Sequence, residues 1–490
     1  MLTAVSVPSA TAAPEPVLEP VVSQQLWGDC AQFAGRVTAP PTAQCTTVQV
    51  PVNPENPGGA QAGLAVIRIP ATGTRIGPLF VNPGGPGASA VDTVAGMGTA
   101  LAGSPIAEHF DLVGVDPRGV GHSTPELRCR TDAEFDAWRR EPMVDYSPAG
   151  VAGIEALYQQ YVNQCVQRMG TDFLATVGTA TAARDLDTVR RVLGDEQLSY
   201  LGFSYGTQIG TAYLEQFGAH VRAMVLDGAV DPSIPTMDET LRQNAGFQTA
   251  FDEYAADCAR SVDCPLGQDP TQWVNRYHAL VDPLATQPGR TADPRGLSRA
   301  DAITGTGRAL YSPRFWNYLT SGLLGLQRGT DADDLLLLAD EYLGRNAQGH
   351  YTNKQDAFNA VRCVDAPVPT DPASWAAFDQ KMRVVAPFSA YGGFTGFAPR
   401  DICAFWPVPA TSSPRPAAPA AAGKAVVVST TRDPATPYQA GVDLARQLQA
   451  PLITFDGTQH TVVFNGQQCV DSATVNYLVE LTAPPENLHC

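Results

Sequence analysis

Residues 198–212 constrain the fold of this chain more than any other stretch. An apolar run at 198–201 predicts a buried strand, Gly202-Phe203-Ser204-Tyr205-Gly206 matches G-x-S-x-G, and 208–217 has helical apolar spacing. A serine in a tight turn between a strand and a helix is the arrangement of a nucleophile elbow. The two glycines let neighbouring backbone pass close to the turn. We therefore predict that Ser204 is a nucleophile at the end of a central strand.

The segments around this stretch have the pattern of a large sheet. Apolar runs of strand length alternate with amphipathic helical patterns, which is typical of a mainly parallel sheet with helices on both faces. The sequence therefore predicts an α/β fold. The expected strands lie at residues 45–52, 62–70, 77–81, 110–116, 198–201, 221–227, 425–429 and 452–455, of which the first two form a hairpin.

The alternation stops between residues 231 and 400, where only helical patterns occur. A Pro/Ala-rich run at 407–422 then leads back to the sheet. We expect a helical cap, or lid, inserted over the sheet. The predicted organisation is an N-terminal arm at 1–20, an α/β catalytic domain at 21–230 and 408–490, and a cap at 231–407.

Charge and hydrophobicity exclude several classes of partner. The 490 residues carry a net charge of −17 and have a pI near 4.8, which argues against nucleic acid and anionic membrane surfaces as partners. No apolar run reaches the 18 residues that a membrane-spanning helix needs. We expect a monomer.

Cysteine usage and the N-terminal arm point to an oxidising compartment. The arm has no charge before Glu15, and Ala10-Thr11-Ala12 has the small-residue pattern of a signal cleavage site. The ten cysteines form no C-x-x-C pair or Cys/His cluster, so we expect no metal and no other cofactor. Disulfides then imply a secreted or cell-envelope protein. Short loop closure favours pairing of sequence neighbours, namely Cys30–Cys45, Cys129–Cys165, Cys258–Cys264, Cys363–Cys403 and Cys469–Cys490.

A serine nucleophile on this turn needs an acid and then a histidine later in the chain. Of seven histidines, His460 alone follows directly after the last predicted central strand, at the sheet edge where α/β folds bind ligands. Asp433 follows the strand at 425–429 and precedes His460 by 27 residues. We predict that His460 is the general base and that Asp433 orients it. Asp456 is the rival acid, and Thr436 is expected to orient Asp433.

Two backbone N–H groups are expected to stabilise the oxyanion. The residue after the nucleophile supplies one of them, which here is Tyr205. The other comes from the glycine-rich segment Gly84-Gly85-Pro86-Gly87 after the strand at 77–81, and Gly85 is the predicted donor. The position of this segment, one strand–helix unit before the elbow, distinguishes it from an ordinary turn.

These motifs resemble those of the prolyl iminopeptidase branch of the α/β-hydrolases. The resemblance rests on the segments at 84–87 and 202–207 and on Asp116-Pro117-Arg118-Gly119-Val120-Gly121-His122-Ser123. The C-terminal part, with Cys403-Ala404-Phe405-Trp406-Pro407 and Asp433-Pro434-Ala435-Thr436-Pro437, is similar to the secreted tripeptidyl aminopeptidases of actinomycetes. Asn82-Pro83 replaces the histidine usual before Gly-Gly-Pro-Gly, and Gln459-His460-Thr461 is closer to mycobacterial cell-envelope hydrolases of this group.

The resemblance implies an acyl-enzyme mechanism that releases short peptides, here tripeptides, from a free N-terminus. A carboxylesterase with the same triad and a non-catalytic binding protein of this fold are the alternatives. A peptidase of this kind must compensate the charge of the substrate ammonium when it is buried. The candidate carboxylates of the cap are Asp238, Glu239, Asp252, Glu253 and Asp365.

Overall fold

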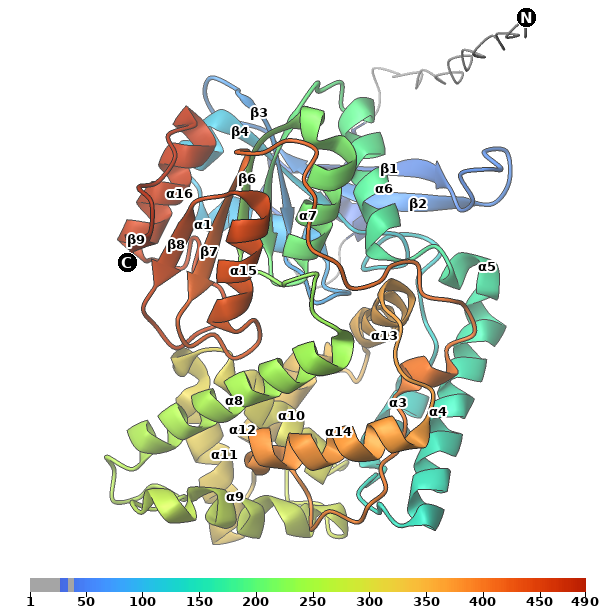
Figure 1. Cartoon of the computed structure of the whole chain (residues 1–490), viewed down its shortest axis with the longest axis vertical. Helices are drawn as coiled ribbons and strands as arrows, with labels where there is room; N and C mark the ends of the chain where they lie inside the picture. Colours follow the sequence, from blue (N-terminus) through green and yellow to red (C-terminus); the bar gives the residue numbers. More distant parts are fainter. Residues whose placement is uncertain (1–26, 34–38) are drawn as a thin grey trace, which may run out of the picture.

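The computed structural model describes residues 27–33 and 39–490, so the predicted signal segment lies outside the described residues. The described residues form a nine-stranded sheet, in which the strands lie in the order β1-β2-β4-β3-β5-β6-β7-β8-β9 (Figure 1). β1 pairs antiparallel with β2, and β2 with β4, whereas all later pairs are parallel. The strands are β1 Gln44–Pro51, β2 Gln61–Ile69, β3 Gly77–Asn82, β4 Phe110–Val115, β5 Leu198–Phe203, β6 Val221–Asp227, β7 Ala425–Thr430, β8 Leu452–Phe455 and β9 Leu488–His489.

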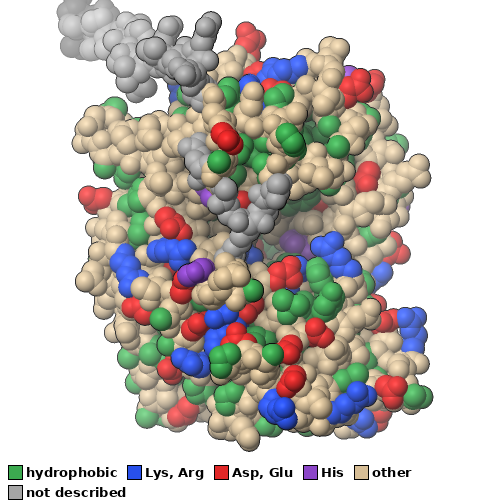
Figure 2. Space-filling view, turned by 180° about the vertical axis from the view of Figure 1, so that it is seen from behind, with side chains coloured by type: hydrophobic (Ala, Val, Ile, Leu, Met, Phe, Trp, Pro, Cys, Tyr) green, Lys and Arg blue, Asp and Glu red, His purple; other side chains and the backbone are tan. Residues whose placement is uncertain are grey.

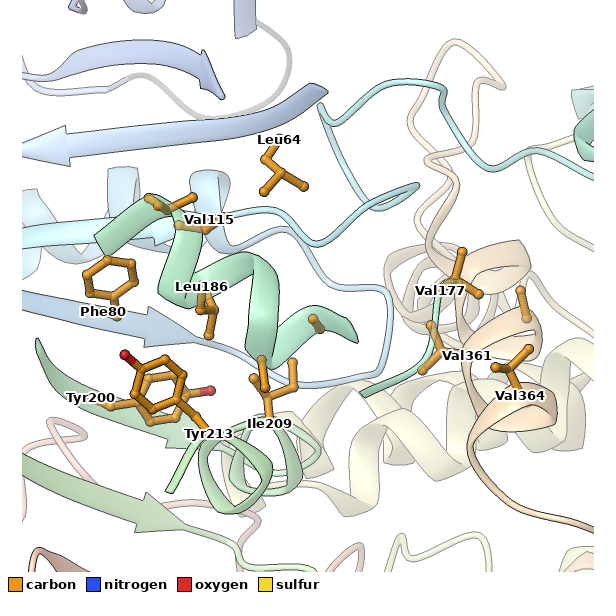
Figure 3. Packing of buried hydrophobic residues seen from close by; sticks show 14 of the residues in the cluster. Leu64, Phe80, Val115, Val177, Leu186, Tyr200, Ile209, Tyr213, Val361 and Val364 are labelled. Carbon is orange, nitrogen blue, oxygen red and sulfur yellow. The ribbon is translucent and has the colours of Figure 1, made fainter. Parts of the chain in front are cut away.

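Helices cover both faces of the sheet, as the alternating pattern predicts. One face packs against α1 (Ala90–Ala100) and α16 (Gln468–Glu480), and the other against α6 (Thr179–Val192), α7 (Gly206–Phe217) and α15 (Tyr438–Leu448). Figure 3 shows Leu186 of α6 and Ile209 of α7 beside Phe80 and Tyr200 of the sheet. β3 to β7 are buried on both sides because both faces are covered, which explains their continuous apolar runs.

From the sequence we expect residues 131–168 to be helical throughout, and the structure has two helices there. α3 spans Asp132–Arg140 and α4 spans Pro148–Met169, and Pro142 lies in the segment between them. Proline lacks the N–H that a helix interior requires, so the first helix ends before it. Thr131 and Glu134 form a capping box at the start of α3, and Ser147 caps α4. The remaining short helices near the sheet are α2 Pro105–His109 and α5 Thr171–Leu174.

The segment between β6 and β7 is helical, as expected, and has its own core. Phe251, Tyr254, Tyr277, Leu319 and Leu335 are fully buried within it. In Figure 1 this region lies against the loops at one end of the sheet. Its helices are α8 Thr236–Cys258, α9 Trp273–Val281, α10 Arg299–Leu310, α11 Trp316–Arg328, α12 Asp333–Leu343, α13 Lys354–Asp365 and α14 Pro372–Val385.

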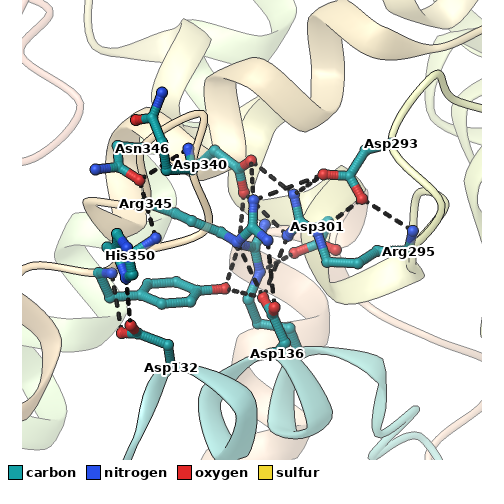
Figure 4. Close-up of polar contacts among 12 residues, drawn as sticks. Asp132, Asp136, Asp293, Arg295, Asp301, Asp340, Arg345, Asn346 and His350 are labelled. Carbon is teal, nitrogen blue, oxygen red and sulfur yellow. Dashed lines mark hydrogen bonds and ion pairs between the residues drawn. The ribbon is translucent and has the colours of Figure 1, made fainter.

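Buried ion pairs tie the helical region to α3. Arg139 of α3 donates to Asp301 of α10 (2.7 Å) and to Asp340 of α12 (2.5 Å), and its side chain is 4% exposed. Figure 4 shows how Arg345 and Arg295 extend the network through Asp340, with which both form ion pairs. Removing one member would leave buried charge without compensation, which costs about 3–5 kcal/mol in proteins. The network therefore holds the helical region in a fixed position relative to α3.

All ten cysteines are paired, and each predicted pair of sequence neighbours is confirmed. The disulfides are Cys30–Cys45, Cys129–Cys165, Cys258–Cys264, Cys363–Cys403 and Cys469–Cys490. The bridge from Cys363 in α13 to Cys403 joins the helical region to the segment that returns to the sheet. Five disulfides are typical of a protein outside the cytoplasm.

The charges on the described surface and the apolar content of the described helices agree with the amino-acid composition. Figure 2 shows acidic and basic side chains interspersed over the lower, helical half of one face of the molecule. Across residues 27–33 and 39–490, no helix combines the length and the apolar character needed to cross a bilayer.

Candidate active site

Ser204 lies in the predicted turn between β5 and α7. Its backbone has φ = 55°, a conformation that non-glycine residues rarely adopt and that is common at functional sites. The turn is fixed from two sides, because the Ser204 N–H donates to the Asp227 carbonyl (2.9 Å) and the Ser204 carbonyl accepts from Thr207. A Cβ at Gly202 would approach the Gly206 carbonyl oxygen to 2.6 Å. The glycine is therefore required by a close approach of backbone within the turn.

His460 and Asp433 form a hydrogen-bonded pair. The Nδ1 atom of His460 lies 2.9 and 3.0 Å from the two carboxylate oxygens of Asp433. Asp433 is 3% exposed and also accepts the N–H groups of Ala435 and Thr436. Burial alone would lower the pKa of His460, but the charge and hydrogen bond of Asp433 outweigh it and raise this pKa. The pair has the geometry of a base oriented by a carboxylate.

The loop that carries His460 lies beside the nucleophile turn. Gly228 follows the residue that accepts the Ser204 N–H, and a Cβ on Gly228 would lie 3.1 Å from the His460 ring. The structure thus places Ser204 after β5, Asp433 after β7 and His460 after β8, in the chain order that the sequence predicts, with Gly228 between the His460 ring and the residue that binds the Ser204 N–H. The rival Asp456 lies apart, because its exposed carboxylate binds Thr431 and Arg432.

The glycine-rich loop after β3 packs directly against the nucleophile turn. A Cβ on Gly84 would lie 2.9 Å from the Tyr205 nitrogen and 3.0 Å from the Ser204 Cβ. Gly85 is exposed and has φ = 109°. Within the described chain, neither the Gly85 N–H nor the Tyr205 N–H donates a hydrogen bond. Two unpaired donors beside a serine are what an oxyanion requires, so this geometry supports the predicted hole.

Several residues contact the site although the sequence around them does not indicate this role. The side chain of Asn82 accepts the Gly84 N–H (2.9 Å). Tyr311, which follows α10, accepts the His460 N–H at 2.9 Å, and its ring meets the imidazole edge-on. Asp227 binds the peptide groups that follow His460. Only Asp227, an acid at the end of a predicted central strand, could have been singled out from the sequence.

The cap carboxylates predicted to meet an ammonium have different surroundings. Asp238, Asp252 and Glu253 are exposed on α8. Asp365 at the end of α13 accepts the hydroxyl of Thr179 (2.5 Å), which also lies 2.6 Å from the Tyr205 hydroxyl. Asp365 is thus linked through the Thr179 hydroxyl to Tyr205, the residue after the nucleophile.

Thr436 contacts both members of the pair. Its hydroxyl donates to Asp433 (2.9 Å) and lies 3.3 Å from Nδ1 of His460. Thr436→Val should lower kcat/KM about tenfold, because a hydrogen bond to a charged group contributes about 1.5 kcal/mol. Steady-state kinetics would measure this. Thr431→Val, which removes a hydroxyl bound to Asp456 instead, is the matched control and should keep full activity. Equal rates in wild type and Thr436→Val would contradict the supporting role.

Comparison with known proteins agrees with this architecture. The sequence pattern of the family described as alpha/beta hydrolase fold matches residues 77–467. The chain belongs to the α/β-hydrolase family. It is 67% identical to carboxylesterase B of Mycobacterium tuberculosis over 472 residues, which cover 96% of this chain and 91% of the relative.

Two further relatives are peptidases by name. Serine protease Hip1 of Mycobacterium tuberculosis is 51% identical over 482 residues, which cover 96% of this chain and 92% of the relative. The tripeptidyl aminopeptidase of Streptomyces lividans is 31% identical over 479 residues, covering 95% of this chain and 86% of the relative. The resemblance found from the motifs is confirmed, and this chain is a serine hydrolase.

Proposed function

We propose that this protein releases short peptides, typically tripeptides, from a free N-terminus as a secreted or cell-envelope enzyme. Ser204 attacks the scissile carbonyl while His460 takes its proton and Asp433 stabilises the imidazolium. The oxyanion forms beside the free N–H groups of Gly85 and Tyr205. His460 then protonates the leaving amine, and water attacks the acyl-enzyme with His460 again as the base. The helices α8 to α14 act as the cap of this site.

The surroundings of Glu239 are the observation that best supports recognition of a free N-terminus. Its side chain has no hydrogen bond or ion pair within the described chain. It lines two adjoining cavities of about 460 and 610 Å³, of which the first also contacts Asp433 and Thr436, and the second Asp365. Burial and the charge of Asp231 raise the pKa of Glu239 to about 7. A substrate ammonium would supply the partner that this carboxylate lacks.

The decisive measurement is a paired assay of one chromogenic tripeptidyl substrate with a free and with an acetylated N-terminus. Acetylation should lower kcat/KM at least about tenfold, equivalent to roughly 1.4 kcal/mol, because it removes the charge that Glu239 binds. Glu239→Gln should remove most of this discrimination by slowing hydrolysis of the free substrate alone. Asp238→Asn, at an exposed position of the same helix, should behave like wild type. Equal rates for the two substrates would overturn N-terminal recognition.

A carboxylesterase is the second candidate, because the relative at 67% identity is named carboxylesterase B. The acyl chemistry is the same, so only the substrate distinguishes the two functions. Short acyl esters assayed beside the peptides would decide: an esterase hydrolyses the esters and leaves free tripeptidyl substrates intact. The unpaired oxyanion donors and the formed His460–Asp433 pair argue against a non-catalytic binding protein.

A further inference from the structure

One buried residue contacts both segments that carry the predicted nucleophile and base. Asp227, the last residue of β6, is 0% exposed. Its backbone carbonyl accepts the Ser204 N–H at 2.9 Å. Its side-chain Oδ2 accepts the N–H groups of Val462 and Val463, both at 2.7 Å. These two peptide groups lie two and three residues after His460, so Asp227 sets the position of the His460 loop relative to the Ser204 turn.

Burial of the Asp227 carboxyl at this position lowers the stability of the fold. Its Oδ1 atom is buried and has no hydrogen-bond partner among the described residues. Burial raises the pKa of Asp227 to about 7, against the opposing effects of the two backbone hydrogen bonds and of His460. An unsatisfied buried carboxyl oxygen destabilises a fold, and such groups in native proteins call for an explanation in function or strain.

The surroundings of His460 supply that explanation. Asp433 reaches the imidazole from the turn after β7, and Asp227 acts on it from β6. The ring of Tyr311 after α10 packs edge-on against it. Conversely, His460 and Asp433 are the charged groups that act on Asp227. Because its pKa is about 7, Asp227 is mainly negative above neutral pH, and there its charge favours the imidazolium that forms when Ser204 loses its proton.

We propose that Asp227 is a positioning residue of the catalytic site, which fixes the spacing of Ser204 and His460 and stabilises the protonated imidazole by its charge. Neither role depends on the substrate, so the inference holds for a peptidase and for an esterase. Its test therefore uses the rate at which a fluorophosphonate labels Ser204, measured from pH 5 to pH 9. A failure of tripeptide recognition would leave this rate unchanged.

Asp227→Asn keeps an oxygen that accepts the two N–H groups and removes the charge. Without that charge the pKa of His460 falls, so the acid limb of the labelling profile should move to lower pH by about 0.5 unit. Asp227→Ala also removes the acceptor, and its maximal labelling rate should fall at least about tenfold. Asp116→Asn is the matched control, because Asp116 is equally buried, accepts the N–H groups of Val91 and His122, and does not contact His460.

The control should lose stability in a thermal melt and leave the acid limb unmoved. An acid limb that stays in place in Asp227→Asn would overturn the proposal, whatever happens to the rate of Asp227→Ala, since a purely structural residue would behave in that way. If Asp227→Ala does not fold, the profile of Asp227→Asn decides alone.

Discussion

Ser204→Ala should abolish both fluorophosphonate labelling and hydrolysis, with kcat falling about 10⁶-fold. In the proposed mechanism the Ser204 hydroxyl forms the acyl-enzyme, and loss of a serine nucleophile alone has an effect of this size in a comparable triad. The left-handed backbone at position 204 is the same for both residues, so the variant should fold. Labelling followed by gel fluorescence, together with a thermal melt, would measure both effects.

Ser199→Ala is the matched control for this experiment. Ser199 lies five residues earlier, in β5, and its buried hydroxyl has no hydrogen-bond partner among the described residues. The control should retain labelling and activity, because its hydroxyl touches no part of the site. Residual labelling of Ser204→Ala would place the nucleophile elsewhere and remove the basis of the proposed mechanism.

The α/β sheet and the disulfide pairs were predictable because their signals are local. Apolar runs such as 425–428 cannot be confused with the amphipathic helices around them, and the turn at Ser204 is identified by its flanking strand and helix. The pairing of Asp433 with His460 was predictable because each directly follows a predicted strand, and parallel strands end at the same edge of a sheet. Closure of short loops then favoured the observed cysteine pairs.

Contacts between distant segments could not be predicted in this way. The Tyr311 carbonyl meets His460 across about 150 residues, and nothing in either local sequence encodes the pairing. Asp365 shows the same limit, because its hydrogen bonds to Thr179 of α6 join segments that are 186 residues apart. The division of α3 from α4 was missed although Pro142 marks it, because the apolar spacing on either side is continuous.

Asp433→Asn should lower kcat by about 10⁴ on any substrate that the enzyme hydrolyses, the size of effect measured for the equivalent change in a serine protease triad. The reason is the tautomer of His460. A carboxylate accepts the proton of Nδ1 and leaves Nε2 free to take the proton of Ser204. An amide that keeps its oxygen toward the N–H groups of Ala435 and Thr436 presents its NH₂ group to Nδ1. The imidazole then carries its proton on Nε2 and cannot act as the base.

Single-turnover labelling and steady-state kcat should fall together in Asp433→Asn, because both require the same proton transfer. Asp456→Asn is the control for the rival acid and should be fully active, since that carboxylate is exposed and binds Arg432. Full activity in Asp433→Asn would leave Asp227 as the carboxylate that supports the base, because it is the other acid whose charge acts on His460. Asp433→Asn combined with Asp227→Asn separates these cases: if Asp433 is the orienting acid, the second change adds only a small further loss to a site that has already lost its base.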